Sequence, residues 1–241
     1  MRTVIAVAAA IAMLAASLWL ARPASADAPP EGIDVSGHQG NVDWGAVAGA
    51  GIKFAMVKAT EGTSYTNDYF AQQYVGSFNA GLIRGAYHFG LPNASSGAAQ
   101  ANFLVDNGGA WSADDHTLPA TLDIEWNPYG ASCYGMSGAS LVAWVHDFVN
   151  TYKARTGRDP IIYTAASWWN DCTGGATDFV ATNPLWIAHY GVSAPNMPNG
   201  WPVYTFWQYT STGSVPGVNG NTDRNIFNGG LDRLLALANN T

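Results

Sequence analysis

Short apolar runs alternate along the chain with stretches in which apolar residues recur every three or four positions. The short runs are rich in β-branched and aromatic residues and predict strands at residues 32–36, 53–59, 82–89, 120–126, 160–165, 185–190 and 203–209. Alternating strands and helices are typical of a parallel α/β sheet, and this many units in one domain favour a barrel over an open sheet.

The helical stretches have recognisable ends. In the clearest one, an apolar stripe runs from Leu141 to Tyr152, with Ser137 as the expected N-cap and Gly157 as the expected C-terminal stop. Shorter helices are predicted at residues 70–81, 96–105 and 231–240.

The alternation breaks at residues 191–202, which are too rich in Pro and Gly for a helix. Because a parallel crossover normally contains a helix, we expect the strands that flank this stretch to be antiparallel. The predicted fold is therefore an irregular (β/α) barrel, TIM-like but with fewer helices and with some antiparallel strand pairing.

The first 26 residues predict a signal peptide. Arg2 precedes an apolar run from Val4 to Leu20, and Ala24 and Ala26 occupy the positions of a small-residue cleavage site. The alternative is a membrane anchor, for which the run is short and rich in Ala. We expect a secreted, extracellular protein in which residues 27–241 form a single catalytic domain.

Composition narrows the possible partners. Without the leader, 8 basic residues stand against 17 acidic ones, a net charge of −9. There is no basic run to bind nucleic acid and no second apolar stretch that could span a membrane. Low charge density with 10 Trp and 11 Tyr suggests a surface that contacts its ligand through aromatic rings. We expect a monomer.

The chain has two cysteines, Cys133 and Cys172. In an oxidising compartment these most simply form one disulfide, and two free buried thiols are the alternative.

Two carboxylates, Asp123 and Glu125, interrupt the apolar run of residues 120–126. Successive side chains of a strand point to opposite faces, so both acids share one face with Thr121, and the apolar residues, including Trp126, share the other. Two neighbouring carboxyl groups raise at least one pKa, which places a protonated acid beside an ionised partner, as glycosidic cleavage requires. The alternative is a strand-end pair bonded to backbone amides, because D-x-E is a common tripeptide.

Other polar side chains also come at strand ends, where the active sites of barrels lie. Asp34 and Ser36 share one face of the first strand. The rest of this set comprises Tyr87, Tyr163, His189, Gln208 and Tyr209. Each could equally be a core residue whose polar group is hydrogen-bonded.

Several ordered blocks resemble the family 25 glycoside hydrolases, the Chalaropsis-type lysozymes. They are "GIDVSGHQGNVDW", "KATEGTSYTND", "IRGAYHF", "LPATLDIEWNP", "IIYTAASWWNDC", "LWIAHYG", "FWQYTSTG" and "TDRNIFNG", and the resemblance spans residues 32–239. It implies an irregular barrel with a long groove, and hydrolysis of the β-1,4 bond between N-acetylmuramic acid and N-acetylglucosamine in bacterial peptidoglycan.

Carried onto the matching positions, the resemblance implies that Glu125 is the proton donor and that Asp123 stabilises the cationic intermediate or orients the N-acetyl group. Asp34 and Asp223 match two further acidic positions of the groove. The implied subsite residues are Tyr87, Tyr163, Trp207 and Gln208.

This chain departs from the family pattern after the first aspartate. The family block commonly reads "DVSHWQG", whereas Gly37 and His38 replace the histidine and the tryptophan here. We expect a stacking surface near Asp34 to be missing, which affects subsite affinity more than catalysis.

Two other functions compete with a muramidase. A carbohydrate-binding protein could use a barrel that has lost its chemistry, although such a protein has no need of a buried acid pair. A metal-dependent hydrolase or deacetylase would need a ligand cluster, and no H-x-x-x-H pattern is present. We therefore expect neither a metal nor another cofactor.

Overall fold

The computed structural model describes residues 28–241. The predicted signal peptide, residues 1–26, lies outside the described residues. Within residues 28–241 we find no helix of the length and apolar character needed to cross a bilayer.

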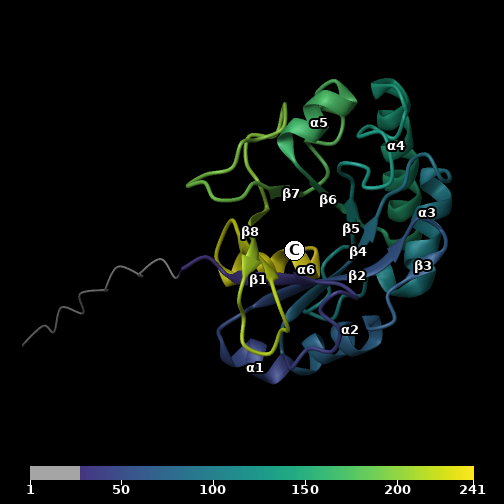
Figure 1. Cartoon of the computed structure of the whole chain (residues 1–241). Helices are drawn as coiled ribbons and strands as arrows, with labels where there is room; N and C mark the ends of the chain where they lie inside the picture. The colour runs from purple at the N-terminus through teal and green to yellow at the C-terminus, as the bar shows by residue number, and fades with distance from the viewer. Residues whose placement is uncertain (1–27) are drawn as a thin grey trace, which may run out of the picture.

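Eight strands close into a barrel, confirming the predicted fold class (Figure 1). They are β1 (Glu31–Val35), β2 (Phe54–Glu61), β4 (Ile83–Phe89), β5 (Thr121–Asp123), β6 (Ile161–Thr164), β7 (Leu185–Ala188), β8 (Phe206–Gly213) and β9 (Thr222–Phe227). The parallel pairing of β1 with β2 completes the ring, and the two-residue strand β3 (Tyr65–Thr66) pairs with the end of β2.

Helices cover the outside of the ring as crossovers between parallel strands (Figure 1). They are α1 (Trp44–Gly49), α2 (Phe70–Asn79), α3 (Gly97–Leu104) with a π-helical turn at Val105–Gly109, α4 (Gly138–Thr156) and α5 (Ala166–Thr173). The predicted ends of α4 are confirmed: Ser137 accepts a hydrogen bond from the Ser140 amide, and Gly157 adopts the left-handed conformation that ends the helix. Helices α1 and α5 were not predicted from the sequence.

The antiparallel pairing lies elsewhere than predicted. The strands that flank residues 191–202, β7 and β8, are parallel, so that expectation was wrong. The long connection crosses back without a helix. Most of its residues are exposed, and Trp201 at its end is buried against Trp169, with the ring centroids 5.2 Å apart. Instead β9, which was not among the predicted strands, runs antiparallel to both β8 and β1.

The barrel interior has an apolar lower part and a polar upper part. Side chains from six strands meet helix α6 (Leu231–Asn239) in a core inside the ring; this core includes Phe54, Met56, Ile161, Phe206, Phe227 and Leu234. Every second residue of a strand points inward, so the inward residues that follow this core lie at the C-terminal mouth of the parallel strands. The apolar filling thus leaves the mouth as the place where polar groups gather.

Strand β5 is shorter than predicted, and this changes the position of one residue. The chain leaves the sheet after Ile124, whose amide still donates to the Tyr163 carbonyl across 3.0 Å. Strand alternation predicted that Trp126 would share the apolar face with Leu122. Because the strand ends early, Trp126 is instead 44% exposed.

Candidate active site

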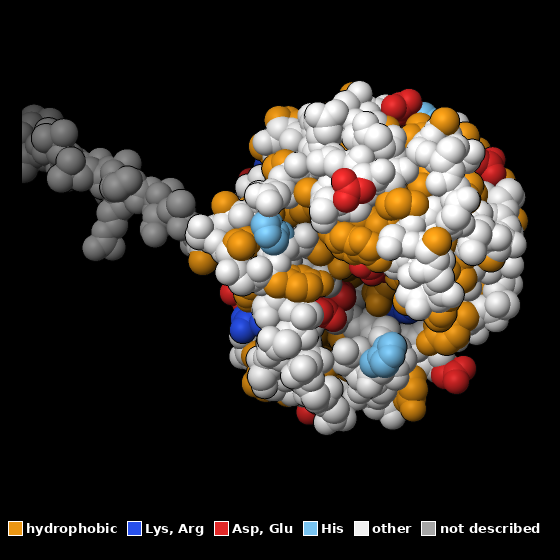
Figure 2. Space-filling model, turned by 45° about the horizontal axis from the view of Figure 1, so that its top comes forward, with side chains coloured by type: hydrophobic (Ala, Val, Ile, Leu, Met, Phe, Trp, Pro, Cys, Tyr) orange, Lys and Arg blue, Asp and Glu red, His pale blue; other side chains and the backbone are white. Residues whose placement is uncertain are grey.

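The mouth of the barrel holds a hollow, which we call the mouth groove, with a volume of about 430 Å³. Acidic side chains lie inside the hollowed face in Figure 2. The groove is lined by Asp34, Ser36, His38, Gln39, Lys58, Tyr87, Phe89, Asp123, Glu125, Tyr163, Trp186, Tyr190, Gln208, Ser211, Asn221 and Asp223. All four predicted catalytic carboxylates are therefore brought together.

The carboxylates reach the groove from two sides. Asp123 is the last residue of β5, and Glu125 follows two positions later in the same inward direction. Asp34 and Asp223 are direct cross-strand partners on β1 and β9. Strands β2 and β4 separate the two pairs around the ring, so a bound chain between them would have acids on both flanks.

Burial raises the pKa of every one of these carboxyl groups, because desolvation disfavours the charged form. The pKa of Asp34 rises from 3.8 to about 6. Burial, and then the charge of Asp34, raise the pKa of Glu125 from 4.5 to about 7 and that of Asp223 from 3.8 to about 8. Burial, with the charge of Glu125, raises the pKa of Asp123 well above its usual value. The groove therefore holds acids that keep protons near neutral pH.

Asp34 differs from the other three carboxylates in its hydrogen bonds. Its Oδ2 accepts from Gln208 Nε2 and from Asn225 Nδ2, each across 2.8 Å. The oxygen of Asn225 accepts from the indole of Trp186 at 2.8 Å. Hydrogen bonds to the charged form favour ionisation, which offsets part of the burial at Asp34.

The amide of Gln208 is oriented by two phenols. Tyr163 and Tyr190 donate to Gln208 Oε1 across 2.7 and 2.6 Å, so only its NH₂ group can face Asp34. Tyr163 and Gln208, predicted as subsite residues, thus line the groove and also belong to the network that holds Asp34.

Asp123 has the opposite environment. Its side chain is 7% exposed, and its Oδ1 has no hydrogen-bond partner within residues 28–241. A buried carboxylate oxygen without a partner is costly unless a ligand supplies a donor. Asp123 is therefore poised to accept a hydrogen bond from a bound molecule.

Of the remaining subsite predictions, Tyr87 lines the groove and meets Trp186 edge to face, with the ring centroids 6.3 Å apart. Trp207, the remaining implied subsite residue, is not among the residues that line the groove. In β8 the inward positions are Phe206 and Gln208, so Trp207 points outward, is 7% exposed in the core beneath the helices, and donates its indole N–H to the His189 carbonyl.

Three residues that line the groove were not predicted from the sequence, namely Lys58, Trp186 and Tyr190, and neither was Asn225, which donates to Asp34. Lys58 could have been predicted, because it follows Phe54 and Met56 at every second position and therefore shares the inward face of β2 with them. Asn225 was missed because β9 was not among the predicted strands.

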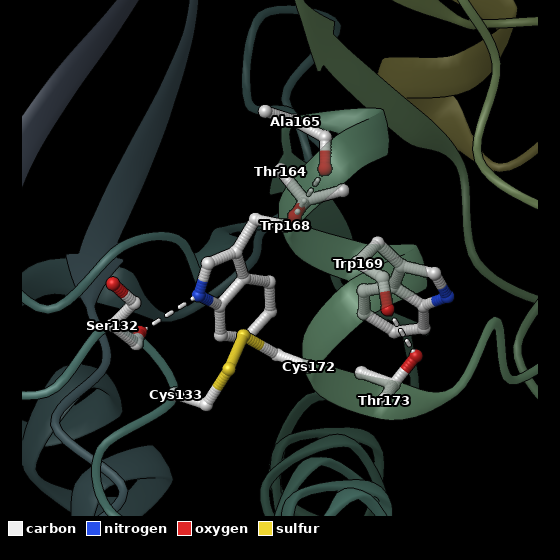
Figure 3. Close-up of a disulfide and its surroundings, with 8 residues drawn as sticks. All are labelled: Ser132, Cys133, Thr164, Ala165, Trp168, Trp169, Cys172 and Thr173. Atoms are coloured by element: carbon white, nitrogen blue, oxygen red, sulfur yellow. Dashed lines mark hydrogen bonds between the residues drawn. A yellow bond between two sulfur atoms is a disulfide. The ribbon is translucent and has the colours of Figure 1, made fainter.

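A disulfide joins Cys133 to Cys172, as predicted, and ties the loop after Glu125 to helix α5 (Figure 3). The same loop is held by the indole N–H of Trp168, which donates to the Ser132 carbonyl across 3.0 Å. The segment that carries Glu125 is therefore anchored on its C-terminal side.

Nowhere in residues 28–241 do three or more His, Cys, Asp or Glu side chains form a cluster suited to a metal ion.

Comparison with known proteins agrees with this geometry. The model of the Glycosyl hydrolases family 25 matches residues 33–218. Lysozyme M1 of Streptomyces globisporus is 58% identical over 88% of this chain and 72% of that protein, and an N,O-diacetylmuramidase of Chalaropsis sp. is 45% identical over 86% and 98%.

Solved structures give the same result. The crystal structure of the bacterial lysozyme from Streptomyces coelicolor superposes with a TM-score of 0.88 at 57% identity, covering 89% of this chain and 99% of that one. The resemblance read from the sequence blocks is confirmed, and the chain belongs to glycosyl hydrolases family 25.

Proposed function

We propose that this glycoside hydrolase is a muramidase that cleaves the β-1,4 bond between N-acetylmuramic acid and N-acetylglucosamine in bacterial peptidoglycan. The observation that carries the proposal is the mouth groove, which is lined by both Glu125, whose pKa burial raises to about 7, and Asp123, whose Oδ1 has no hydrogen-bond partner within residues 28–241. The names of the lysozyme and muramidase relatives support the same substrate.

In the first step Glu125 donates its proton to the glycosidic oxygen while the bond to the anomeric carbon breaks. The 2-acetamido oxygen of the substrate attacks that carbon, and the resulting oxazolinium-like cation is stabilised by Asp123, whose free oxygen accepts from the acetamido N–H. Water then opens the ring and gives up a proton to Glu125, which restores the acid.

The other two acids offer a competing route. Asp34 or Asp223 could activate water for direct attack on the anomeric carbon, with inversion. The assisted route predicts that the first-formed product retains the anomeric configuration. Proton NMR of the product during the first minutes of digestion distinguishes them, and an inverted first anomer would exclude the participation of the acetamido group.

The pH dependence of activity should follow Glu125. A general acid works only when protonated, and its pKa of about 7 extends the protonated range upward from 4.5. We expect kcat/KM to fall about tenfold per pH unit above pH 7. The profile is measured on soluble glycan fragments at constant ionic strength. A fall in kcat/KM that already begins near pH 4.5, or a kcat/KM that stays constant up to pH 9, would contradict this assignment.

Export belongs to the same proposal: residues 1–26 act as a signal peptide, and residues 27–241 work outside the cell as one catalytic domain. The disulfide between Cys133 and Cys172 supports an oxidising compartment.

A turbidity assay on purified bacterial walls tests the function. A muramidase clears the suspension and releases soluble fragments, whereas a protein that only binds carbohydrate would sediment with the walls and leave the turbidity unchanged.

A further inference from the structure

Beside the mouth groove lies a second hollow, which we call the tyrosine pocket, with a volume of about 460 Å³. Its walls are formed by Tyr65, Tyr69 and Tyr129 together with Lys58, Glu61 and Asp68. The two hollows are neighbours, because Lys58 and His38 line both of them. A substituent on a sugar bound among the carboxylates could therefore extend into the pocket.

The ring surfaces of the pocket are unusually open. The exposed fractions of its three tyrosines are 41% for Tyr65, 39% for Tyr69 and 71% for Tyr129. Exposed aromatic groups gathered in one place mark a binding surface. Tyrosine rings offer flat contact area for planar amide groups, and their hydroxyls offer hydrogen bonds.

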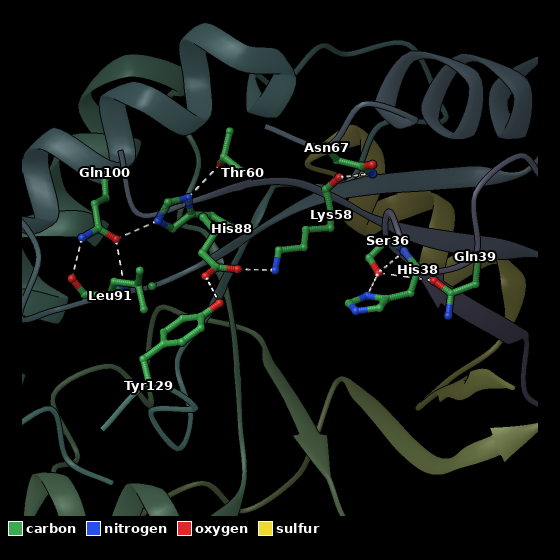
Figure 4. Close-up of polar contacts among 12 residues, drawn as sticks. Ser36, His38, Gln39, Lys58, Thr60, Asn67, His88, Leu91, Gln100 and Tyr129 are labelled. Carbon is green, nitrogen blue, oxygen red and sulfur yellow. Dashed lines mark hydrogen bonds and ion pairs between the residues drawn. The ribbon is translucent and has the colours of Figure 1, made fainter. Parts of the chain in front are cut away.

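Two of the charged groups of the pocket, Lys58 and Glu61, are paired with each other. Lys58 Nζ lies 2.6 Å from Glu61 Oε2, and the Tyr129 hydroxyl donates to Glu61 Oε1 across 2.6 Å, so both oxygens of Glu61 are engaged. Figure 4 shows Lys58 and Tyr129 directed toward the same carboxylate. The Lys58 ammonium also lies 5.3 Å from the centroid of the Tyr65 ring. An ammonium has three donors, so Lys58 can still bind a substrate carboxylate.

Asp68 is the charged group of the pocket that makes no ion pair with residues 28–241, and it is exposed. Its carboxylate is free to pair with a cation brought by the ligand. The pocket thus offers a cation at its inner end, an unpaired anion and three tyrosine rings. The sugars of the wall strand carry no amine, because their nitrogens are acetylated, whereas the peptides attached to muramic acid carry amides, carboxylates and an amine.

We propose that the tyrosine pocket binds the peptide attached to the lactyl group of muramic acid, with Lys58 near its carboxylates and Asp68 near the side-chain amine of its diamino acid. This inference rests on the proposed muramidase function. The pocket would make the enzyme prefer peptide-bearing glycan over bare glycan.

The departure at Gly37 opens this pocket. A Cβ atom at position 37 would lie 3.1 Å from the Tyr65 hydroxyl and 3.4 Å from Asn67 Oδ1, so a larger side chain would crowd Tyr65. The glycine that replaces the family's usual histidine therefore leaves room beside the ring. Replacing Gly37 with His should narrow the pocket and weaken the preference for peptide.

The test compares two substrates: soluble wall fragments that keep their peptides, and the same fragments after an amidase has removed them. Tyr65→Ala should lower kcat/KM on the peptide-bearing fragments about tenfold, and Asp68→Asn about threefold. Both variants should stay within about twofold of the parent on the stripped glycan, because neither residue belongs to the catalytic groups. Asp178→Asn, an exposed acid outside both hollows, is the matched control for Asp68→Asn.

Acetylating the amines of the peptide tests whether Asp68 binds an amine. The parent enzyme should then fall to the level of Asp68→Asn, and that variant should be unaffected. Equal losses on both substrates, or no loss on either, would overturn the inference, since the pocket would then hold sugar or nothing. A parent enzyme inactive on both substrates would overturn the proposed muramidase function itself, and this inference with it.

Discussion

Replacing Glu125 with Gln should lower turnover on bacterial walls at least a hundredfold. The amide keeps the size of the side chain but has no proton to give to the glycosidic oxygen, and general acids contribute about 10²–10⁴ to such reactions. Turnover is measured as the initial rate of reducing-sugar release. Asp178→Asn removes an acid outside the groove and should keep full activity.

The same variant carries its own control for folding. Burial raises the folded-state pKa of Glu125 from 4.5 to about 7, so the folded protein binds this proton more tightly than the unfolded chain. The carboxyl group therefore lowers the free energy of unfolding as pH rises from 4.5 to 7. Glu125→Gln removes that cost, so its Tm should match the parent at pH 4 and equal or exceed it at pH 8. Near-normal turnover in a folded variant would remove Glu125 as the acid.

Replacing both Cys133 and Cys172 with Ala should lower the free energy of unfolding by about 2–5 kcal/mol. The bond closes a long loop, with a sequence separation of 39, and such cross-links restrict the unfolded chain. For a domain of this size the Tm should fall by roughly 5–15 °C. Calorimetry measures the shift.

Activity at low temperature separates stability from catalysis in this variant. The loop after Glu125 keeps its hydrogen bond from Trp168, so turnover well below the Tm should stay within about threefold of the parent. Reductant should lower the Tm of the parent to that of the double variant and leave the variant unchanged. A Tm difference below about 1 °C would show that the cross-link adds little.

Much of the fold could be predicted because its signals are local. Strand alternation placed Asp34 and Asp123 on inward faces, and Ser137 and Gly157 marked the ends of a helix. The orientation of β9 was not predictable from a short polar segment such as "TDRNIF", because its pairing depends on strands far away in the chain. The bend after Ile124, which exposes Trp126, is likewise set by tertiary contacts.

The site divides in the same way. The four carboxylates follow from sequence blocks and strand register, but the network around Asp34 does not. It joins Gln208 and Asn225 to Trp186, which come from three strands and meet only when the barrel closes. Sequence blocks can also suggest a site residue that lies elsewhere: Trp207 is next to Gln208 in the chain but points to the other face of the sheet, into the core.

If the groove cleaves the glycan after muramic acid, that sugar forms the new reducing end of each product. Purified peptidoglycan is digested, the products are reduced with borohydride, and mass spectrometry identifies the reduced sugar. We expect reduced N-acetylmuramic acid at the end of every new fragment. Reduced N-acetylglucosamine, or peptides released from intact glycan, would contradict it.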